Sequence, residues 1–145
     1  ITVTDPDMTR FVISQKQAID FVFAATELAK GGEIFIQKMK VLKISNLVDV
    51  MLDLYAPPGE RNKIKLEIIG RQPGEKDYEE LMTAEEVTRA VETDDMFILK
   101  PQIPDLFERE YHYPGERNPG VAQYVSRDVP LMTAGEIKSL LKEIR

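Results

Sequence analysis

Two segments of the chain contain the residues best suited to bind an anion, and Arg10 is the first. It precedes the first predicted helix by a few positions, in the string Thr-Asp-Pro-Asp-Met-Thr-Arg-Phe at residues 4–11. A guanidinium is always charged, and its planar fork can donate two parallel hydrogen bonds to phosphate oxygens. The N-terminus of the following helix would favour the same negative charge. From residue type alone, an ion pair between Arg10 and Asp5 or Asp7 is the more ordinary interpretation.

The second segment is the loop at residues 71–76, which reads Arg-Gln-Pro-Gly-Glu-Lys. The Pro-Gly pair predicts a turn. Arg71 supplies another guanidinium, and Glu75 supplies a carboxylate that can accept hydrogen bonds. An ion pair of Glu75 with Lys76 or Arg71 is an equally good interpretation, so both stay open at this point.

Other catalytic signals are weak. The chain has one histidine, His112, and one imidazole cannot form a histidine-rich metal cluster, so we expect a loop residue at a surface or interface. Neither glycine-rich phosphate-binding motif is present, and no Tyr is followed four residues later by Lys. The basic run Lys38, Lys40 and Lys43 could approach a phosphate, but a solvated loop is expected. The sequence therefore contains no complete active site of a familiar type.

Composition narrows the class of protein. The 145 residues, 43% hydrophobic, suffice for one domain with a real core. A net charge of −6 argues against a uniformly basic nucleic-acid-binding protein, and the lack of cysteine excludes disulfides and thiolate metal sites. No apolar run approaches the ~18 residues of a membrane span. Because the first residue is Ile1, we expect either a removed leader or a piece of a longer protein.

The pattern of apolar residues predicts a mixed α/β fold with no linker that divides it. Helical spacing predicts a helix over residues 15–30, begun by Ser14 and Gln17 and ended by Gly31 and Gly32. Four aromatic residues are expected in the core: Phe11, Phe21, Phe23 and Phe35. Strands are predicted at 33–37, 63–69 and 96–99, of which the second is half-buried, and the segment at 101–123 is expected to be irregular. Three further helices are predicted: one with Ser45 as its N-cap, a short one to Val91 begun by Thr83 and Glu86, and a C-terminal one begun by Thr133 and Glu136. The apolar face of the C-terminal helix contains Ile137, Leu140, Leu141 and Ile144.

Three strings resemble a known family. The string at residues 3–11 leads into the first helix, and Ile-Gly-Arg-Gln-Pro-Gly-Glu-Lys at 69–76 is followed by Glu-Glu-Leu-Met-Thr at 79–83. The tail from Tyr124 to Ile137 is similar more loosely. Together they resemble the C-terminal half of the polysaccharide-biosynthesis branch of the extended short-chain dehydrogenase/reductases. This branch contains UDP-N-acetylglucosamine 4,6-dehydratases, some of which are also 5-epimerases.

The resemblance implies that residues 1–145 are the C-terminal, substrate-binding region of a longer, cytoplasmic enzyme. The first helix and the next strand would join a Rossmann domain that lies upstream. That domain would bind NAD(P) and carry the Tyr-x-x-x-Lys pair, so this fragment alone should be inactive. The expected partners are a UDP-sugar and further copies of the chain, and neither a nucleic acid nor a membrane span is expected.

The resemblance also assigns roles to residues. Arg10 would pair with the diphosphate, and Glu75 would accept hydrogen bonds from the ribose. The family usually has arginine directly before the Pro-Gly pair, where this chain has Gln72, and Arg71 precedes it. Since successive side chains of an extended segment point to opposite faces, Arg71 need not replace that arginine. The implied substrate-binding residues are Arg10, Arg71, Gln72, Glu75 and Thr9, with Thr4 as a weaker candidate.

Two alternatives remain open. The chain could be a stand-alone, non-catalytic module that binds a nucleotide-sugar or a protein, which Gln72 favours slightly. It could also be an acidic α/β scaffold without a ligand. The geometry around Arg10 distinguishes them, because a ligand site leaves its guanidinium facing an open cleft and a scaffold satisfies it internally.

Overall fold

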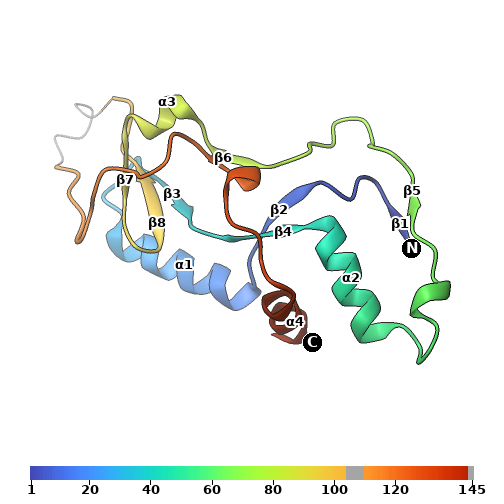
Figure 1. Cartoon of the computed structure of the whole chain (residues 1–145). Helices are drawn as coiled ribbons and strands as arrows, with labels where there is room; N and C mark the ends of the chain where they lie inside the picture. Colours follow the sequence, from blue (N-terminus) through green and yellow to red (C-terminus); the bar gives the residue numbers. More distant parts are fainter. Residues whose placement is uncertain (104–109, 144–145) are drawn as a thin grey trace. The chain divides into compact units, whose positions relative to one another are not determined.

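The computed structural model describes residues 1–103 and 110–143, and it has the predicted mixed α/β fold (Figure 1). It consists of two compact units, each assembled from separated parts of the chain. Unit 1 contains Ile1–Ser14, Lys40–Glu79 and Ser126–Arg145, and unit 2 contains Gln15–Met39 and Glu80–Val125. The chain crosses between the units at 14–15, 39–40, 79–80 and 125–126, where a helix or strand begins at once, so no separate linker marks the division.

Unit 1 is built on two short strand pairs. Strand β2 (Thr9–Val12) pairs antiparallel with β4 (Lys40–Lys43), and Arg10 lies opposite Leu42. Strand β1 (Thr2–Val3) pairs in parallel with β5 (Glu67–Ile68). The helical elements of the unit are α2 (Ile44–Tyr55), the 3-10 helices η1 (Arg61–Lys63) and η3 (Ser126–Asp128), and α4 (Ala134–Glu143).

Helices α2 and α4 close the core of unit 1. Four buried residues form its centre, namely Leu42, Val50, Met132 and Ile137, and Val12, Leu47, Leu140 and Leu141 pack against them. The predicted capping box of α4 is confirmed, because the backbone N–H groups of Thr133 and Glu136 each bond to the other residue's side chain, at 2.8 and 3.3 Å. Ile144 lies outside the described residues.

Unit 2 contains a three-stranded antiparallel sheet in the order β3-β8-β7. Its strands are β3 (Ile34–Gln37), β8 (Met96–Leu99) and β7 (Ala90–Glu92). Five buried residues of this unit, Val91, Met96, Ile98, Tyr111 and Tyr113, pack with Phe21, Ala24 and Leu28 of α1 (Gln15–Leu28) and with Phe35. The unit also contains α3 (Ala84–Val87) and the pair β6 (Glu80–Met82) and β9 (Tyr124–Val125).

Local signals predicted the elements of unit 2 well. The helix at 15–30, the strand at 33–37 and the buried strand at 96–99 are confirmed as α1, β3 and β8. The Thr83–Glu86 capping box is also present, but α3 ends at Val87 and Val91 belongs to β7. Phe23 is exposed over 67% of its surface, so its assignment to the core is wrong.

Three predictions for unit 1 are wrong. The basic segment expected as a solvated loop contains β4, whose Val41 and Leu42 are buried. Helix α2 begins at Ile44, so Ser45 lies inside it and is not its N-cap. Of the strand predicted over 63–69, only Glu67–Ile68 pairs with another strand, and Ile68 is 61% exposed. Alternating polar and apolar residues here do not face a core.

In the described part of the chain, no helix combines the length and the apolar character that crossing a membrane requires.

Candidate functional site

Unit 1 contains all of the predicted substrate-binding residues. Arg10 and Thr9 stand next to each other on β2, and Arg71, Gln72 and Glu75 lie in the loop that follows β5. The two segments that the sequence singled out are therefore parts of one compact unit, although about sixty residues separate them in the chain.

The guanidinium of Arg10 ties β2 to the loop. Its Nη2 donates to the carbonyl of Lys76 at 2.8 Å, and its Nη1 donates to the carbonyl of Thr9, also at 2.8 Å. Nη2 lies 3.9 Å from Oε1 of Glu75, and 24% of the Arg10 side chain is exposed. Arg10 thus pairs with neither of the acids first considered for it. Within the described residues, its charge is opposed by one carboxylate at long range, and its other partners are neutral carbonyls and Met8 Sδ, at 3.2 Å from Nη2.

Glu75 holds the loop in its turn. Its Oε2 accepts from the backbone N–H of Gln72 at 3.1 Å, and its own N–H donates to the Gln72 carbonyl at 3.0 Å. The turn places Gly74 at a φ of +85°, which side chains disfavour. Oε1 of Glu75 accepts from the Thr4 hydroxyl at 3.1 Å. Glu75 is therefore a partner of Thr4 and Arg10, and neither Lys76 nor Arg71 pairs with it among the ion pairs of the described residues.

Arg71 is engaged by two acids on unit 1. Its Nη1 lies 2.6 Å from Asp77, and its Nε lies 3.4 Å from Asp5. The side chain remains 53% exposed, so it can still meet solvent. Gln72 is exposed as well. A ligand phosphate would have to share Arg71 with two carboxylates, whereas the ion pairs of residues 1–103 and 110–143 give Arg10 one carboxylate, at 3.9 Å.

Ser126 is a buried residue of this region that sequence reasoning missed. Its Oγ lies 2.8 Å from the Oγ1 of Thr9 and accepts from the backbone N–H of Glu79 at 2.9 Å. The hydroxyl of Thr9, a predicted substrate contact, thus has a protein partner, and the residue as a whole is 9% exposed. No local signal distinguishes a serine with this role from one at a surface turn.

The other charged candidates are occupied by ion pairs. Lys40 and Lys43 lie 2.6 Å from Glu136 and Asp7 on unit 1, and Lys38 lies 2.6 Å from Glu92 on unit 2. His112 is exposed, as expected, and its Nδ1 lies 3.2 Å from Glu116. Because each of these lysines is already paired with a carboxylate, the basic run is a poor candidate for a phosphate site.

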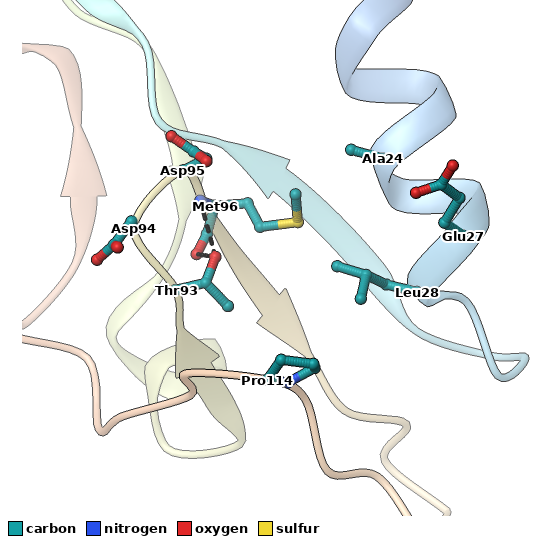
Figure 2. Close-up of a pocket in the computed structure, with 8 residues that line it drawn as sticks. All are labelled: Ala24, Glu27, Leu28, Thr93, Asp94, Asp95, Met96 and Pro114. Carbon is teal, nitrogen blue, oxygen red and sulfur yellow. Dashed lines mark hydrogen bonds between the residues drawn. The ribbon is translucent and has the colours of Figure 1, made fainter.

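The pocket drawn in Figure 2 does not offer a better anion site. It has a volume of about 350 Å³ and lies on unit 2 between α1 and the turn that joins β7 to β8. Glu27, Asp94 and Asp95 line it, together with Ala24, Leu28, Thr93, Met96 and Pro114. Carboxylates repel a phosphate, and none of the predicted substrate-binding residues contributes to the lining. The surroundings of Arg10 therefore remain the candidate site.

Comparisons with known proteins identify the family of the chain. Residues 1–101 match the family model described as polysaccharide biosynthesis protein. An uncharacterized membrane protein of Methanocaldococcus jannaschii is 40% identical over 99% of this chain and 41% of its own length. A UDP-glucose 4-epimerase of Rickettsia canadensis is 32% identical over 97% of this chain and 40% of its own.

A solved structure has the same fold. The X-ray structure of Pen from Bacillus thuringiensis superposes with a TM-score of 0.80 at 37% identity, over 98% of this chain and 40% of that one. The chain spans about 40% of the length of each of these proteins. Both the family match and the relatives agree with the resemblance to the polysaccharide-biosynthesis branch of the extended short-chain dehydrogenase/reductases. This chain belongs to the polysaccharide biosynthesis protein family.

Proposed function

We propose that this chain is the UDP-sugar-binding part of a nucleotide-sugar 4,6-dehydratase or epimerase. The observation that carries the proposal is the joining of Arg10 to the 71–76 loop on one unit. A relative named UDP-glucose 4-epimerase supports the nucleotide-sugar class. The sequence strings quoted above favour the dehydratase type within that class.

In this proposal Arg10 binds the diphosphate. Its side chain is 24% exposed, and its nearest carboxylate oxygen is 3.9 Å away, so no close carboxylate competes with a phosphate. Its Nη atoms donate to the carbonyls of Thr9, Lys76 and Asp77 and to Met8 Sδ, and a diphosphate would have to displace some of these bonds. Glu75 accepts hydrogen bonds from the ribose, for which it would release the Thr4 hydroxyl at 3.1 Å. Binding energy gained at the remote UDP would hold the sugar in the geometry that its reacting carbons need.

The remainder of the enzyme would come from a part of the protein outside residues 1–145. The relatives are more than twice as long as this chain, and residues 1–145 contain no glycine-rich dinucleotide motif. We assign no residue of this chain to NAD(P), which would supply the hydride acceptor. Helix α1 exposes Ile19, Val22 and Phe23 to 56%, 61% and 67%, a face that the other part of the protein or a second copy would cover.

Product analysis with the full-length protein tests the proposal. The protein would be incubated with UDP-N-acetylglucosamine and, separately, with UDP-glucose, and the products followed by NMR. A dehydratase gives a 4-keto-6-deoxy sugar with loss of water. Inversion at C4 alone would instead make the enzyme a 4-epimerase.

The same experiment addresses the non-catalytic alternative. Gln72 favours that alternative because it lacks the positive charge of the arginine that the family usually has at this position. Unchanged sugars together with measurable UDP binding would support a binding module. Unchanged sugars without UDP binding would contradict the proposed function altogether and leave the scaffold interpretation.

A further inference from the structure

We infer that Ser126 is a positioning residue, which fixes the acceptors of the Arg10 guanidinium and so sets the affinity for the UDP moiety. The inference rests on the proposed function and concerns the same site. Ser126 follows β9 in the C-terminal segment, beyond the residues 1–101 that match the family model.

The hydroxyl of Ser126 has a complete set of partners in a fully buried place. The residue is 0% exposed. Its Oγ donates to the Thr9 carbonyl at 3.2 Å, and it accepts from the Glu79 N–H at 2.9 Å. The Thr9 hydroxyl, at 2.8 Å, then serves as the second donor to Oγ. One donor and two acceptor positions are the full capacity of a hydroxyl.

These bonds lie on the edge of β2 that does not face β4. Along that edge the backbone N–H of Thr9 donates to the Asp77 carbonyl at 3.0 Å, and the N–H of Phe11 donates to the Glu79 carboxylate at 2.7 Å. The backbone N–H of Ser126 donates to the Glu79 carbonyl at 2.8 Å. Residues 77–79 and Ser126 therefore take the place that a third strand would have in a larger sheet.

Arg10 holds the same segment a few residues earlier. Its guanidinium donates to the carbonyls of Lys76 and Asp77, at 2.8 and 3.4 Å. Residues 76–79 are thus fastened to β2 at one end by Arg10 and at the other by Ser126. The guanidinium of Arg127 also lies 3.9 Å from the centre of the Tyr78 ring, which adds a contact from the C-terminal segment.

Loss of the Ser126 hydroxyl should disturb this arrangement specifically. The buried Thr9 hydroxyl and the partly buried Glu79 N–H would each lose a partner, and residues 77–79 would have to shift to find another. The carbonyls that orient Arg10 belong to the same short segment and would move with it. The guanidinium would then be out of place for the diphosphate, although no residue in contact with the ligand has changed.

The test measures UDP binding by the full-length protein with titration calorimetry. We expect Ser126→Ala to weaken UDP binding about tenfold, and Ser126→Cys, which keeps a weak donor on a slightly larger side chain, to have a smaller effect. Ser139→Ala is the matched control, because Ser139 lies in the same C-terminal segment and its exposed hydroxyl donates to the Gly135 carbonyl within α4. Thermal unfolding of each variant shows that the titrated protein is folded.

A double-mutant cycle with Arg10→Ala separates positioning from general stability. If Ser126 acts through Arg10, Ser126→Ala should change UDP affinity less than twofold in the Arg10→Ala background. An equal loss in both backgrounds, or no loss in the unaltered background, would overturn the inference while leaving the proposed function in place. No UDP binding by the unaltered protein would overturn both.

Discussion

The Oγ of Ser126 lies 2.8 Å from the Oγ1 of Thr9, and 117 positions separate the two residues in the sequence. This contact fastens the C-terminal segment to the strand that carries Arg10. The C-terminal segment is therefore a structural part of the candidate site, although the family model ends at residue 101.

Gln72→Arg should strengthen UDP binding by roughly threefold to tenfold, because a charged donor bonds a phosphate more strongly than a neutral amide. Gln72 is exposed in its turn, so a longer side chain fits without repacking. Calorimetric titration of the full-length protein with UDP measures the effect. Gln102→Arg makes the same change of charge on unit 2 and should have no effect. Equal gains in both variants would mean that net charge, and not position, is responsible.

Glu92 should make the stability of unit 2 sensitive to acid. Burial raises its pKa, but hydrogen bonds from Lys38, the Gly120 N–H and Arg117 outweigh that effect and lower the pKa from 4.5 to about 2. A lowered pKa means that the carboxylate stabilises the fold above pH 4.5 and that this contribution is lost as the pH falls toward 2.

Glu92→Gln should accordingly lower the Tm at pH 7 and have little effect near pH 2, measured by thermal unfolding across that range. The exposed Glu27 on α1 provides the control, and Glu27→Gln should leave the Tm within about a degree of the unaltered protein. A Glu92→Gln difference that stays constant with pH would contradict the assigned ionisation.

Thr133→Ala should destabilise the protein by about 1 kcal/mol, because it removes the side-chain cap of α4. Helix α4 contributes Ile137 to the core of unit 1, so fraying at its first turn should reach the centre of that unit. Chemical denaturation measures the change. Thr26→Ala on α1 is the control, since the exposed Thr26 hydroxyl donates to the Val22 carbonyl within the helix and Ala favours a helix. Similar losses in both variants would argue against a capping role.

Elements with local signals could be predicted from the sequence. Helix α1 has apolar residues at helical spacing and two glycines after its end, at φ values of 112° and 89°. The capping boxes at Thr83 and Thr133 depend on residues three positions apart, and both are present. Strand β8 is a short run of apolar residues, and all four are buried.

Elements that depend on distant partners could not be predicted. Strands β2 and β4 are four residues each and become strands by pairing with one another. The lysines of β4 suggest a loop, but their ammonium groups reach Asp7 and Glu136 at its two ends while Val41 and Leu42 are buried. The division into two units could not be predicted either, because each unit is assembled from segments that lie far apart in the sequence.

For the candidate site, residue type and resemblance identified Arg10 and Glu75 but not their partners. The acids near Arg10 in sequence pair elsewhere, Asp5 with Arg71 and Asp7 with Lys43. Arg10 instead reaches Glu75 and the backbone of the loop. These choices follow from how the segments pack, which a pattern of charges along the chain does not contain.

The most direct test of the central claim is UDP binding by the full-length protein and its Arg10→Ala variant. We predict that the unaltered protein binds UDP and that Arg10→Ala weakens binding at least tenfold, while Arg61→Ala, an exposed arginine of the same unit paired with Asp49 and Asp53, does not. Equal UDP affinity in the Arg10→Ala and unaltered proteins would contradict the account.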